Sequence, residues 1–380
     1  MFEGVRVLDL SRLLPGPFAT LALADLGAVV DRLEEMGGEY LRPMPPLLGD
    51  TSGYFLALNR NKRSACIDLK KPEACAALLR LVESYDVLVE QFRPGVLDRL
   101  GLGHDVLLAR NPKLIVCSIT GYGQSGPDRE RAGHDLNYVA RAGLLGFTGG
   151  SPSHVPGYQV ADVGGALWAA FAIAGALYER TRTGVGRVID ISMTEAAMGF
   201  GAMSFGQMVA GKIPAPGEEL LSGGIAGYNT YTTKDDRSIA VAALEPKFWM
   251  KLCAALGLPV EGESFFPGPH QEKWKERLAD LVRQRTQAEW IAFSREHDVC
   301  MEPVLSPDEL TNDPQHTARK MFFSLPSPHG PVAQVCTPLT DRSREHRFPP
   351  GPGEHTELIF REAGFTADEI AAMRATQAVG

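Results

Sequence analysis

Residues 5–34, VRVLDLSRLLPGPFATLALADLGAVVDRLE, decide the fold of this chain. An apolar run at 5–10 predicts a strand, and the periodic segment 18–26 predicts a helix that ends at Gly27. A second apolar run at 28–33 predicts another strand. Because a strand–helix–strand unit pairs its strands in parallel, we expect an α/β large domain with a Rossmann-like, doubly wound parallel sheet.

The turn inside this unit argues against a nicotinamide cofactor. It reads Pro15-Gly16-Pro17 and lacks the GxGxxG pattern, whose glycines let the backbone approach a pyrophosphate. Prolines are rigid where such a turn needs conformational freedom. We therefore expect a ligand at the strand ends, but not a dinucleotide.

The alternation of strands and helices continues along the chain and is typical of one doubly wound domain. Further strands are predicted at 64–69, 86–90, 113–119 and 187–192. Further helices are predicted at 74–84, 96–100, 163–178 and 193–211. The segment 163–178 is apolar on all sides, so it is expected to be buried, with Asp162 as its N-cap.

A change of composition predicts a second, smaller domain. Residues 1–213 form the first part of the large domain, and the Gly/Pro-rich residues 214–227 form a linker. An alternating hairpin at 228–243, followed by helical patterns, predicts a small α+β domain at 228–322. The remainder, 323–380, is expected to return to the large domain as a proline-rich strap and a C-terminal helix.

The composition is that of a globular protein with an acidic balance. The chain has 380 residues and a net charge of -8, with 44% hydrophobic and 22% charged residues, so nucleic acid is not an expected partner. Its 6 cysteines lack metal-ligand spacing, which predicts no metal site and a reducing compartment. The N-terminus shows no secretory pattern, and the apolar run 163–178 is too short to span a bilayer. We expect a cytoplasmic protein without a membrane partner.

Basic residues gather near the predicted strand ends, against the overall sign of the charge. They are Arg32, Arg60, Lys62, Arg63 and Arg93. Each of them alone would more often be a solvated surface residue. As a group they favour a phosphate-bearing ligand along one edge of the sheet.

The segment GHDLNY, residues 133–138, places an imidazole, a carboxylate, an amide and a phenol close together. It follows a glycine-rich turn and precedes a predicted helix, so His134 and Asp135 lie at or before the first helical turn. Unpaired N–H groups there can hold an anionic oxygen. The alternative is an ordinary aspartate cap beside a surface histidine, and the local sequence leaves both interpretations open.

Motifs along nearly the whole chain resemble those of the family III CoA-transferase superfamily, also called the CaiB/BaiF family. They are VLDLSRLLPGPFAT, ADLGAVVDRLE, LNRNKRSACIDLK, VLVEQFRPGVLDRLGLG, ITGYGQSGP, AGHDLNY, the aspartate of VADVGG, the hairpin that ends in ALEP, and Asp313-Pro314. Within the superfamily the chain is most similar to the α-methylacyl-CoA racemases. The residue that matches Asp162 is a nucleophile in the CoA-transferases, and the racemases add the residues that match His134 and Glu245.

The resemblance implies a racemase of 2-methylacyl-CoA thioesters. His134 and Asp162 would move the proton at carbon 2 through an enolate, and Glu245 would orient the His134 ring. Asp135 would belong to the site because it starts the helix whose N–H groups receive the enolate oxygen. Two alternatives stay open: a CoA-transferase with Asp162 as nucleophile, and a non-catalytic protein that binds acyl-CoA.

The resemblance also implies a groove for the coenzyme A part of the substrate, with no separate cofactor. The residues that match this groove are Arg12, Arg32, Lys62, Arg63, Arg93, Gly121, Tyr122 and Gly123. Of these, we expect Arg32 and Arg93 to contribute most.

Subunits of the superfamily interlock as ring-shaped homodimers, so the resemblance implies a homodimer. The site would then lie between the large domain of one subunit and the small domain of the other. Two positions depart from the racemase pattern: Ala161 stands in place of a glycine, and Tyr158 in place of an asparagine. A tyrosine there would reshape the acyl pocket, so the departures concern the substrate more than the chemistry.

Overall fold

The computed structural model of the protein describes residues 1–213, 215–260 and 262–380. Pro214, with which the predicted linker begins, lies outside the described residues. The described chain divides into two compact units, each of which is treated by itself. Unit 1 comprises residues 1–138, 158–197 and 313–380, and unit 2 comprises residues 139–157 and 198–312.

Unit 1 is built on a six-stranded parallel sheet with the strand order β5-β2-β1-β6-β7-β8. The strands are β1 Arg6–Leu10, β2 Val29–Glu34, β5 Arg63–Cys66, β6 Val87–Glu90, β7 Ile115–Thr120 and β8 Arg187–Ser192. The strand order reverses between β1 and β6, and doubly wound sheets bind ligands beyond the carboxyl ends of strands at such a reversal. The predicted parallel sheet is therefore confirmed, and its topology indicates where a ligand would lie.

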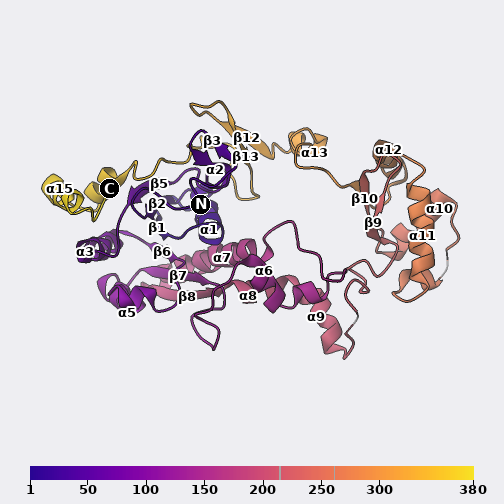
Figure 1. The fold of residues 1–380 in the computed structure, drawn as a ribbon, viewed down its shortest axis with the longest axis horizontal. Coiled ribbons are helices and arrows are strands. Elements are labelled where there is room, and N and C mark those ends of the chain that lie inside the picture. The colour runs from indigo at the N-terminus through magenta and orange to yellow at the C-terminus, as the bar shows by residue number, and fades with distance from the viewer. Residues whose placement is uncertain (214, 261) are drawn as a thin grey trace. The chain divides into compact units, whose positions relative to one another are not determined.

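Helices cover both faces of this sheet (Figure 1). On one face, α1 Pro15–Asp25 packs against α7 Val160–Thr183, which also contacts β7 and β8. On the other face, apolar side chains join a core cluster from α3 Pro72–Leu81, α5 His104–Arg110, α14 Thr356–Glu362 and α15 Ala367–Ala375. The other helices that lie wholly or partly in unit 1 are α2 Gly53–Leu58, α4 Val96–Arg99, α6 Asp135–Arg141, α8 Met193–Phe200 and α13 Pro314–Ala318.

Helix α1 begins earlier than predicted. Pro15 lies in its first turn, where the N–H group that proline lacks would have no partner in the helix anyway. The Pro-Gly-Pro sequence therefore starts the helix instead of forming a separate turn. The boundary of 18–26 was wrong, although the strand–helix–strand unit is confirmed.

Helix α7 differs from its prediction in length and in burial. It runs over 24 residues from Val160 to Thr183, so Asp162 lies inside its first turn and is not its N-cap. Its small residues are buried, but Trp168, Phe171 and Tyr178 are exposed, so the prediction of complete burial was wrong. By length and composition alone α7 could cross a membrane, which the shorter predicted run could not. Within the described structure, 44% of its apolar window is buried.

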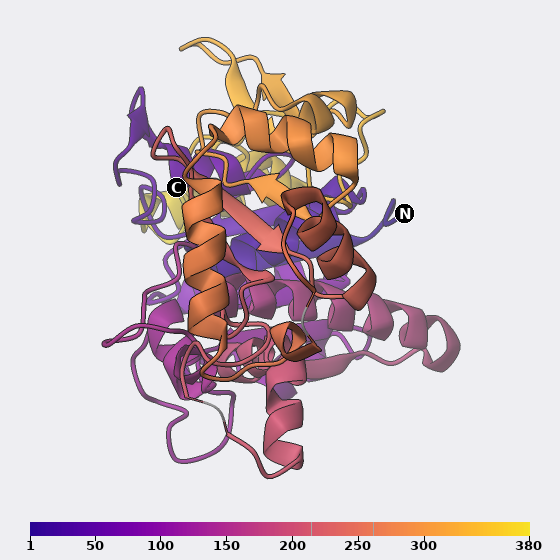
Figure 2. The same ribbon diagram turned by 90° about the vertical axis from the view of Figure 1, so that its right-hand side faces the viewer.

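Unit 2 contains a three-stranded antiparallel sheet in the order β11-β10-β9. Its strands are β9 Tyr228–Thr232, β10 Ser238–Ala242 and β11 Met301–Pro303, of which the first two form the predicted hairpin. Its helices include α9 Ala202–Val209, α10 Pro246–Leu256, α11 Gln271–Val282 and α12 Gln287–His297. Figure 2 shows α10, α11 and α12, in brown and orange, grouped about the strands, with Trp249, Trp274 and Trp290 in the core. This arrangement is α+β, as predicted.

Two short hairpins are additional to the predicted strands, and the second lies largely within the predicted strap. They are β3 Leu47–Leu48 with β4 Thr51–Ser52, and β12 Phe322–Leu325 with β13 Val332–Val335. Neither strand pair is long enough to show a clear period in the sequence. The strap leads to α14 and to the predicted C-terminal helix, α15, whose N-cap is Thr366.

Candidate active site

A cavity of about 460 Å³ lies in unit 1 beyond the carboxyl ends of the central strands. The segments that follow β1, β6 and β7 line it, together with the start of α6 and the first turn of α7. The structure brings His134 and Asp162 to this one cavity. It lies at the reversal of strand order, where the topology of the sheet places a ligand.

His134 is exposed and directly precedes α6. Its backbone N–H donates to Asn137 Oδ1 at 3.0 Å, and the Asn137 N–H donates back to the His134 carbonyl at 2.8 Å. These reciprocal bonds fix the backbone of the turn while the imidazole lines the cavity. Asn137 therefore holds the backbone of His134 in the conformation that directs the imidazole towards the cavity. The sequence motif alone did not predict this role for Asn137.

Asp162 is poised between its two protonation states at neutral pH. Burial in the first turn of α7 and, secondly, the nearby charge of Asp135 raise the pKa of Asp162 from 3.8 to about 7. Both effects penalise the ionised carboxylate. A carboxyl group with such a pKa can accept or release a proton near pH 7, as an acid–base group must.

Asp135 links the two segments that carry these residues. Its Oδ1 atom accepts hydrogen bonds from the N–H groups of Ala161 at 2.7 Å and Asp162 at 3.0 Å. Among the residues that the structure describes, the N–H groups of Asp135 and Leu136 have no hydrogen-bond partner. Neither residue is among those that line the cavity, so the binding of a ligand oxygen by these N–H groups stays a prediction.

Tyr138 fills the space beneath the GHDLNY turn. Its hydroxyl donates to the Gly133 carbonyl, and its ring makes an edge-to-face contact with Tyr122, with 5.3 Å between the centroids. A Cβ atom on Gly121 or Gly133 would come within 2.3 or 2.7 Å of the Tyr138 ring, so only glycine fits at either position. Burial, followed by the charge of Asp162, raises the pKa of Tyr138 to about 12, so the phenol stays protonated. Tyr138 thereby fixes the turn before His134.

The predicted CoA-binding turn lies beside the cavity, but only one of its residues lines it. Gly121 lines the cavity, whereas Tyr122 stacks on Tyr138 and Gly123 is buried. The Gly123 N–H donates to Thr120 Oγ1 at 3.0 Å. The structure therefore shows these residues supporting the shape of the turn, and their contact with CoA stays a prediction.

Arg12 and Arg93 are exposed cations of the cavity wall. Arg12 follows β1 and Arg93 follows β6, so they flank the reversal of strand order. Arg129 and Arg131 also line the cavity and pair with Glu130 and Asp128 of their own loop. The sequence prediction missed these two arginines, although the charged run that precedes GHDLNY could have drawn attention to them.

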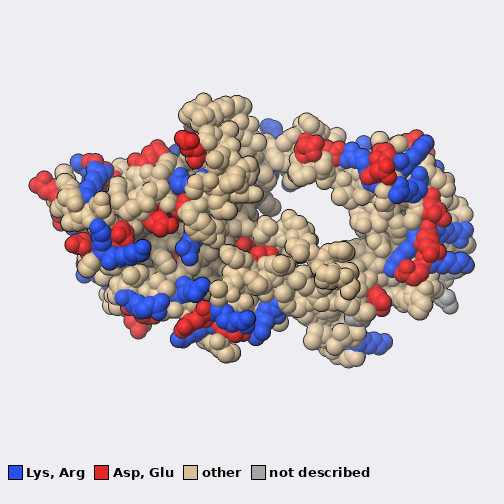
Figure 3. Space-filling model, in the orientation of Figure 1, with Lys and Arg blue, Asp and Glu red and all other residues tan. Residues whose placement is uncertain are grey.

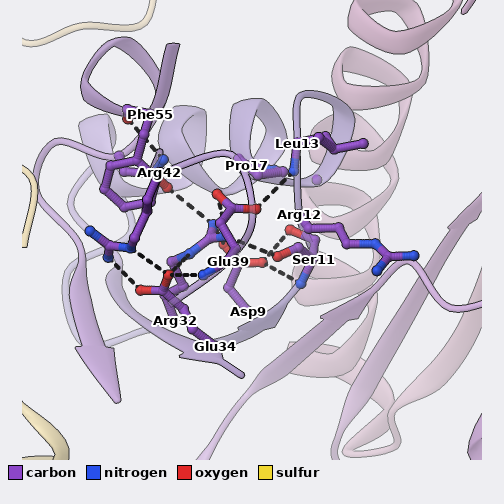
Figure 4. Close-up of polar contacts among 12 residues, drawn as sticks. Asp9, Ser11, Arg12, Leu13, Pro17, Arg32, Glu34, Glu39, Arg42 and Phe55 are labelled. Carbon is purple, nitrogen blue, oxygen red and sulfur yellow. Dashed lines mark hydrogen bonds and ion pairs between the residues drawn. The ribbon is translucent and has the colours of Figure 1, made fainter. Parts of the chain in front are cut away.

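Arg32 lies in a buried network of charges at the ends of β1 and β2 (Figure 4). Its Nη2 atom lies 2.8 Å from Glu39 Oε1, and Glu34 and Asp9 lie within 4 Å of other guanidinium atoms. Arg42 pairs with the same Glu34. Burial alone would raise the pKa of Glu34, but Arg42 and Arg32 outweigh it and lower that pKa to about 2.

Lys62 and Arg63 are likewise engaged inside the protein. Lys62 Nζ lies 3.4 Å from Asp9 Oδ2, and burial lowers the pKa of Lys62 to about 8 although Asp9 opposes the shift. Arg63 pairs with Asp31 and Glu362. CoA binding by Arg32, Lys62 and Arg63 stays a prediction, but their contacts indicate a stabilising role. In Figure 4 the Arg12 side chain instead points away from the network.

Replacing Arg32 by methionine is expected to lower the free energy of unfolding by about 3–5 kcal/mol, because it leaves buried carboxylates without their partner. Replacing the exposed Arg12 by methionine should leave stability nearly unchanged and weaken the binding of CoA. Urea unfolding and calorimetric titration with CoA measure the two effects. Wild-type stability of the Arg32 variant together with weakened CoA binding would contradict the structural assignment.

A second cavity, of about 540 Å³, lies beside the buried network. Arg12 and Phe92 line both cavities, so the two are neighbours at the edge of the sheet. Lys70 and Asp68 follow β5 and line the second cavity alone. Two adjoining cavities suit a long ligand better than a small one.

Glu245 belongs to unit 2, at the N-terminal end of α10. It is exposed, and its Oε2 atom pairs with Lys247 Nζ at 2.9 Å. Its hydrogen bond to His134 stays a prediction. Of the two departures from the racemase pattern, Ala161 is buried and Tyr158 is 71% exposed.

Among the described residues, no group of three or more His, Cys, Asp or Glu side chains is placed to hold a metal ion. On the face shown in Figure 3, Lys and Arg residues are interspersed with Asp and Glu residues over the surface of each unit. The cations that line the two cavities of unit 1 are Arg12, Arg32, Lys70, Arg93, Arg129 and Arg131.

The chain is similar to known proteins in sequence and in fold. The family model described as CoA-transferase family III matches residues 2–356. An alpha-methylacyl-CoA racemase of Mus musculus is 38% identical, covering 97% of this chain and 95% of its own. A succinyl-CoA:glutarate CoA-transferase of Homo sapiens is 32% identical, covering 95% and 86%. The crystal structure of a CAIB/BAIF family protein from Brucella suis superposes with a TM-score of 0.81 at 30% identity, covering 95% and 98%.

Proposed function

This chain belongs to CoA-transferase family III, and on that premise we propose that it is a racemase of 2-methylacyl-CoA thioesters. The observation that carries the proposal is that His134 and Asp162 line one cavity. The higher identity to a racemase, 38% against 32% for a CoA-transferase, also supports it.

His134 and Asp162 act on opposite faces of carbon 2. One removes the proton from carbon 2, and the electron pair of the broken C–H bond moves into the thioester to form an enolate. The other then delivers a proton to the opposite face, which inverts the configuration. Because the pKa of Asp162 lies near 7, its carboxyl group can take either part at neutral pH.

The enolate oxygen needs donors that are in place before the reaction. The N–H groups of Asp135 and Leu136 serve this purpose, since they have no partner among the described residues and adjoin His134. Donors that are already oriented stabilise developing negative charge at little cost of reorganisation. Glu245 of unit 2 orients the His134 imidazole in the assembled enzyme.

The CoA part of the substrate extends from the catalytic cavity into its neighbour. Arg12 lines both cavities and Arg93 lines the catalytic one, so these exposed guanidinium groups can meet phosphate oxygens. The thioester then reaches His134 and Asp162. This placement relies on Arg12 and Arg93 more than on the buried Arg32.

The second candidate is a CoA-transferase in which Asp162 is a nucleophile. Its support is the 32% identity to a succinyl-CoA:glutarate CoA-transferase. A nucleophilic carboxylate must be ionised, and so must a carboxylate that removes a proton from carbon 2, so the pKa of Asp162 near 7 is compatible with both functions. The presence of His134 in the same cavity favours the racemase, because a transferase that uses Asp162 as nucleophile does not require a second acid–base group there.

Deuterium exchange separates the two functions. In deuterated water, the racemase exchanges the proton at carbon 2 of a 2-methylacyl-CoA without any acceptor acid. Mass spectrometry of the recovered thioester, with and without added succinate, measures exchange and CoA transfer together. Transfer of CoA to succinate without exchange would establish the transferase and exclude the racemase.

The active protein is also proposed to be a homodimer. The exposed side chains of Trp168, Phe171 and Tyr178 give α7 an apolar face of the kind that a second copy would cover. Light scattering should give twice the chain mass of 41.1 kDa, and Phe171→Asp should shift the mass towards a monomer. A monomeric wild-type protein at micromolar concentration would refute the homodimer.

A further inference from the structure

We propose that Asp135 is a positioning residue, which holds the start of α7 against the His134 turn and so sets the distance between His134 and Asp162. The inference deepens the proposed function and rests on it for the roles of His134 and Asp162. The hydrogen bonds of Asp135 are independent of those roles.

The first turn of α7 is capped from a distant part of the chain. Its own N-cap residue, Gln159, makes no side-chain cap, although the first N–H groups of a helix need partners outside it. Asp135 Oδ1 supplies that partner to both Ala161 and Asp162. A carboxylate is well suited to this task because it accepts several hydrogen bonds and carries the charge that a helix start attracts.

These two hydrogen bonds join the two halves of the site. Asp135 is the neighbour of His134 in the chain, and one of its partners is the backbone N–H of Asp162 itself. The His134 turn is in turn fixed by Asn137 and by Tyr138. The two bonds therefore tie the backbone of Asp162 to that of the His134 turn, and a shift of about 1 Å between catalytic groups can reduce a rate by about 100-fold.

Asp135 also acts on Asp162 through its charge. Burial raises the pKa of Asp162, and Asp135 raises it further. The other titratable or charged groups of the cavity are Arg12, Tyr40, Arg93, Arg129, Arg131, His134 and Tyr138. Since none of these is a second carboxylate, removing the charge of Asp135 removes the nearby negative charge that holds the pKa of Asp162 up.

Two substitutions separate the positional role from the electrostatic one. Asp135→Asn keeps an oxygen that can accept both N–H groups, but removes the charge. The acidic limb of its kcat/KM profile should therefore move to lower pH by about one unit, and its kcat should fall less than that of Asp135→Ala. Asp135→Ala also removes the acceptor, and its kcat should fall by about 100-fold.

Asp313 provides the matched control. It caps α13 by accepting the N–H groups of Gln315 and His316 at 2.9 Å, and it does not line the catalytic cavity. Asp313→Ala removes a helix cap and should lower thermal stability, while the pH profile of both Asp313 variants, Asp313→Asn and Asp313→Ala, keeps its wild-type position. A loss of kcat in Asp313→Ala equal to that in Asp135→Ala would overturn the positioning role.

A carbon-13 NMR titration tests the same inference without any turnover. The aspartate carboxyl groups are labelled, and Asp162→Asn identifies the Asp162 signal. In folded Asp135→Asn this signal should titrate at a lower pH than in the wild type, and an unchanged titration would overturn the inference. Because the titration needs no substrate, it tests Asp135 even if deuterium exchange rejects the racemase.

Discussion

Asp162→Asn is expected to slow the inversion of 2-methylacyl-CoA by about 10²–10⁴-fold, the usual contribution of one acid–base group. Asparagine has nearly the same shape but can neither take nor release a proton, so the binding of acyl-CoA should change little. Chiral chromatography of the thioester measures inversion, and calorimetry measures binding. Asp105→Asn is the control, because Asp105 also lies in a first helical turn but is exposed and away from the cavity.

The same substitution should also change how stability depends on pH. The pKa of Asp162 is about 7 in the folded chain and lies near 3.8 when unperturbed, so folding favours its neutral form. That contribution to stability is fully present below about pH 4 and is lost as the pH rises through about 7. Asparagine is neutral at every pH, so Asp162→Asn should gain stability relative to the wild type over this range. Urea unfolding at pH 5 and pH 8 measures the gain, and a constant difference would contradict it.

His134→Ala is expected to reduce inversion by a similar factor of about 10²–10⁴. The exposed imidazole makes no side-chain hydrogen bond within unit 1 that the fold would lose. Thermal unfolding should therefore match that of the wild type. His329→Ala, at another exposed histidine outside the cavity, is the matched control.

His134→Ala also separates the two candidate functions where Asp162→Asn does not. Asp162 is needed for inversion by a racemase and for CoA transfer by a transferase, so its loss slows both of these turnover reactions. A transferase that uses Asp162 as nucleophile would still move CoA to an acceptor acid without His134. Retained CoA transfer in His134→Ala would therefore favour the transferase.

The central strands could be predicted because of how parallel sheets are buried. β1, β6 and β7 are covered on both faces, so each is a short, mainly apolar run between turns, whereas β2 also carries the buried Asp31, Arg32 and Glu34. The hairpin of unit 2 could be predicted equally well. One face of each of its strands is more buried than the other, which produces an alternating sequence pattern. Elements such as α2 and α5 were missed because 6 or 7 residues show too little of a helical period.

Helix starts were harder to predict where their caps lie far away in the sequence. The prediction began α7 after Asp162 because an aspartate before an apolar run is a common N-cap. The actual first turn has no local side-chain cap and is satisfied by Asp135. No pattern within the α7 sequence contains that information.

The candidate site, like the fold, could be predicted only in part. The GHDLNY motif and Asp162 could be read from the sequence by resemblance, and the structure brings His134 and Asp162 to one cavity. The role of Arg32 could not be predicted from the sequence. An arginine at a strand end gives the same sequence pattern whether its side chain binds a phosphate or a buried carboxylate. Only the folded loop reveals that Glu39 lies 2.8 Å from its guanidinium group.

The opposed action of His134 and Asp162 is tested most directly by supplying each enantiomer of a 2-methylacyl-CoA separately in deuterated water. His134→Ala and Asp162→Asn each retain one base, so each should exchange the carbon 2 proton of one enantiomer without inverting it. The enantiomer that exchanges should differ between the two variants. Exchange of the same enantiomer by both variants, or rapid inversion by either, would contradict a two-base site.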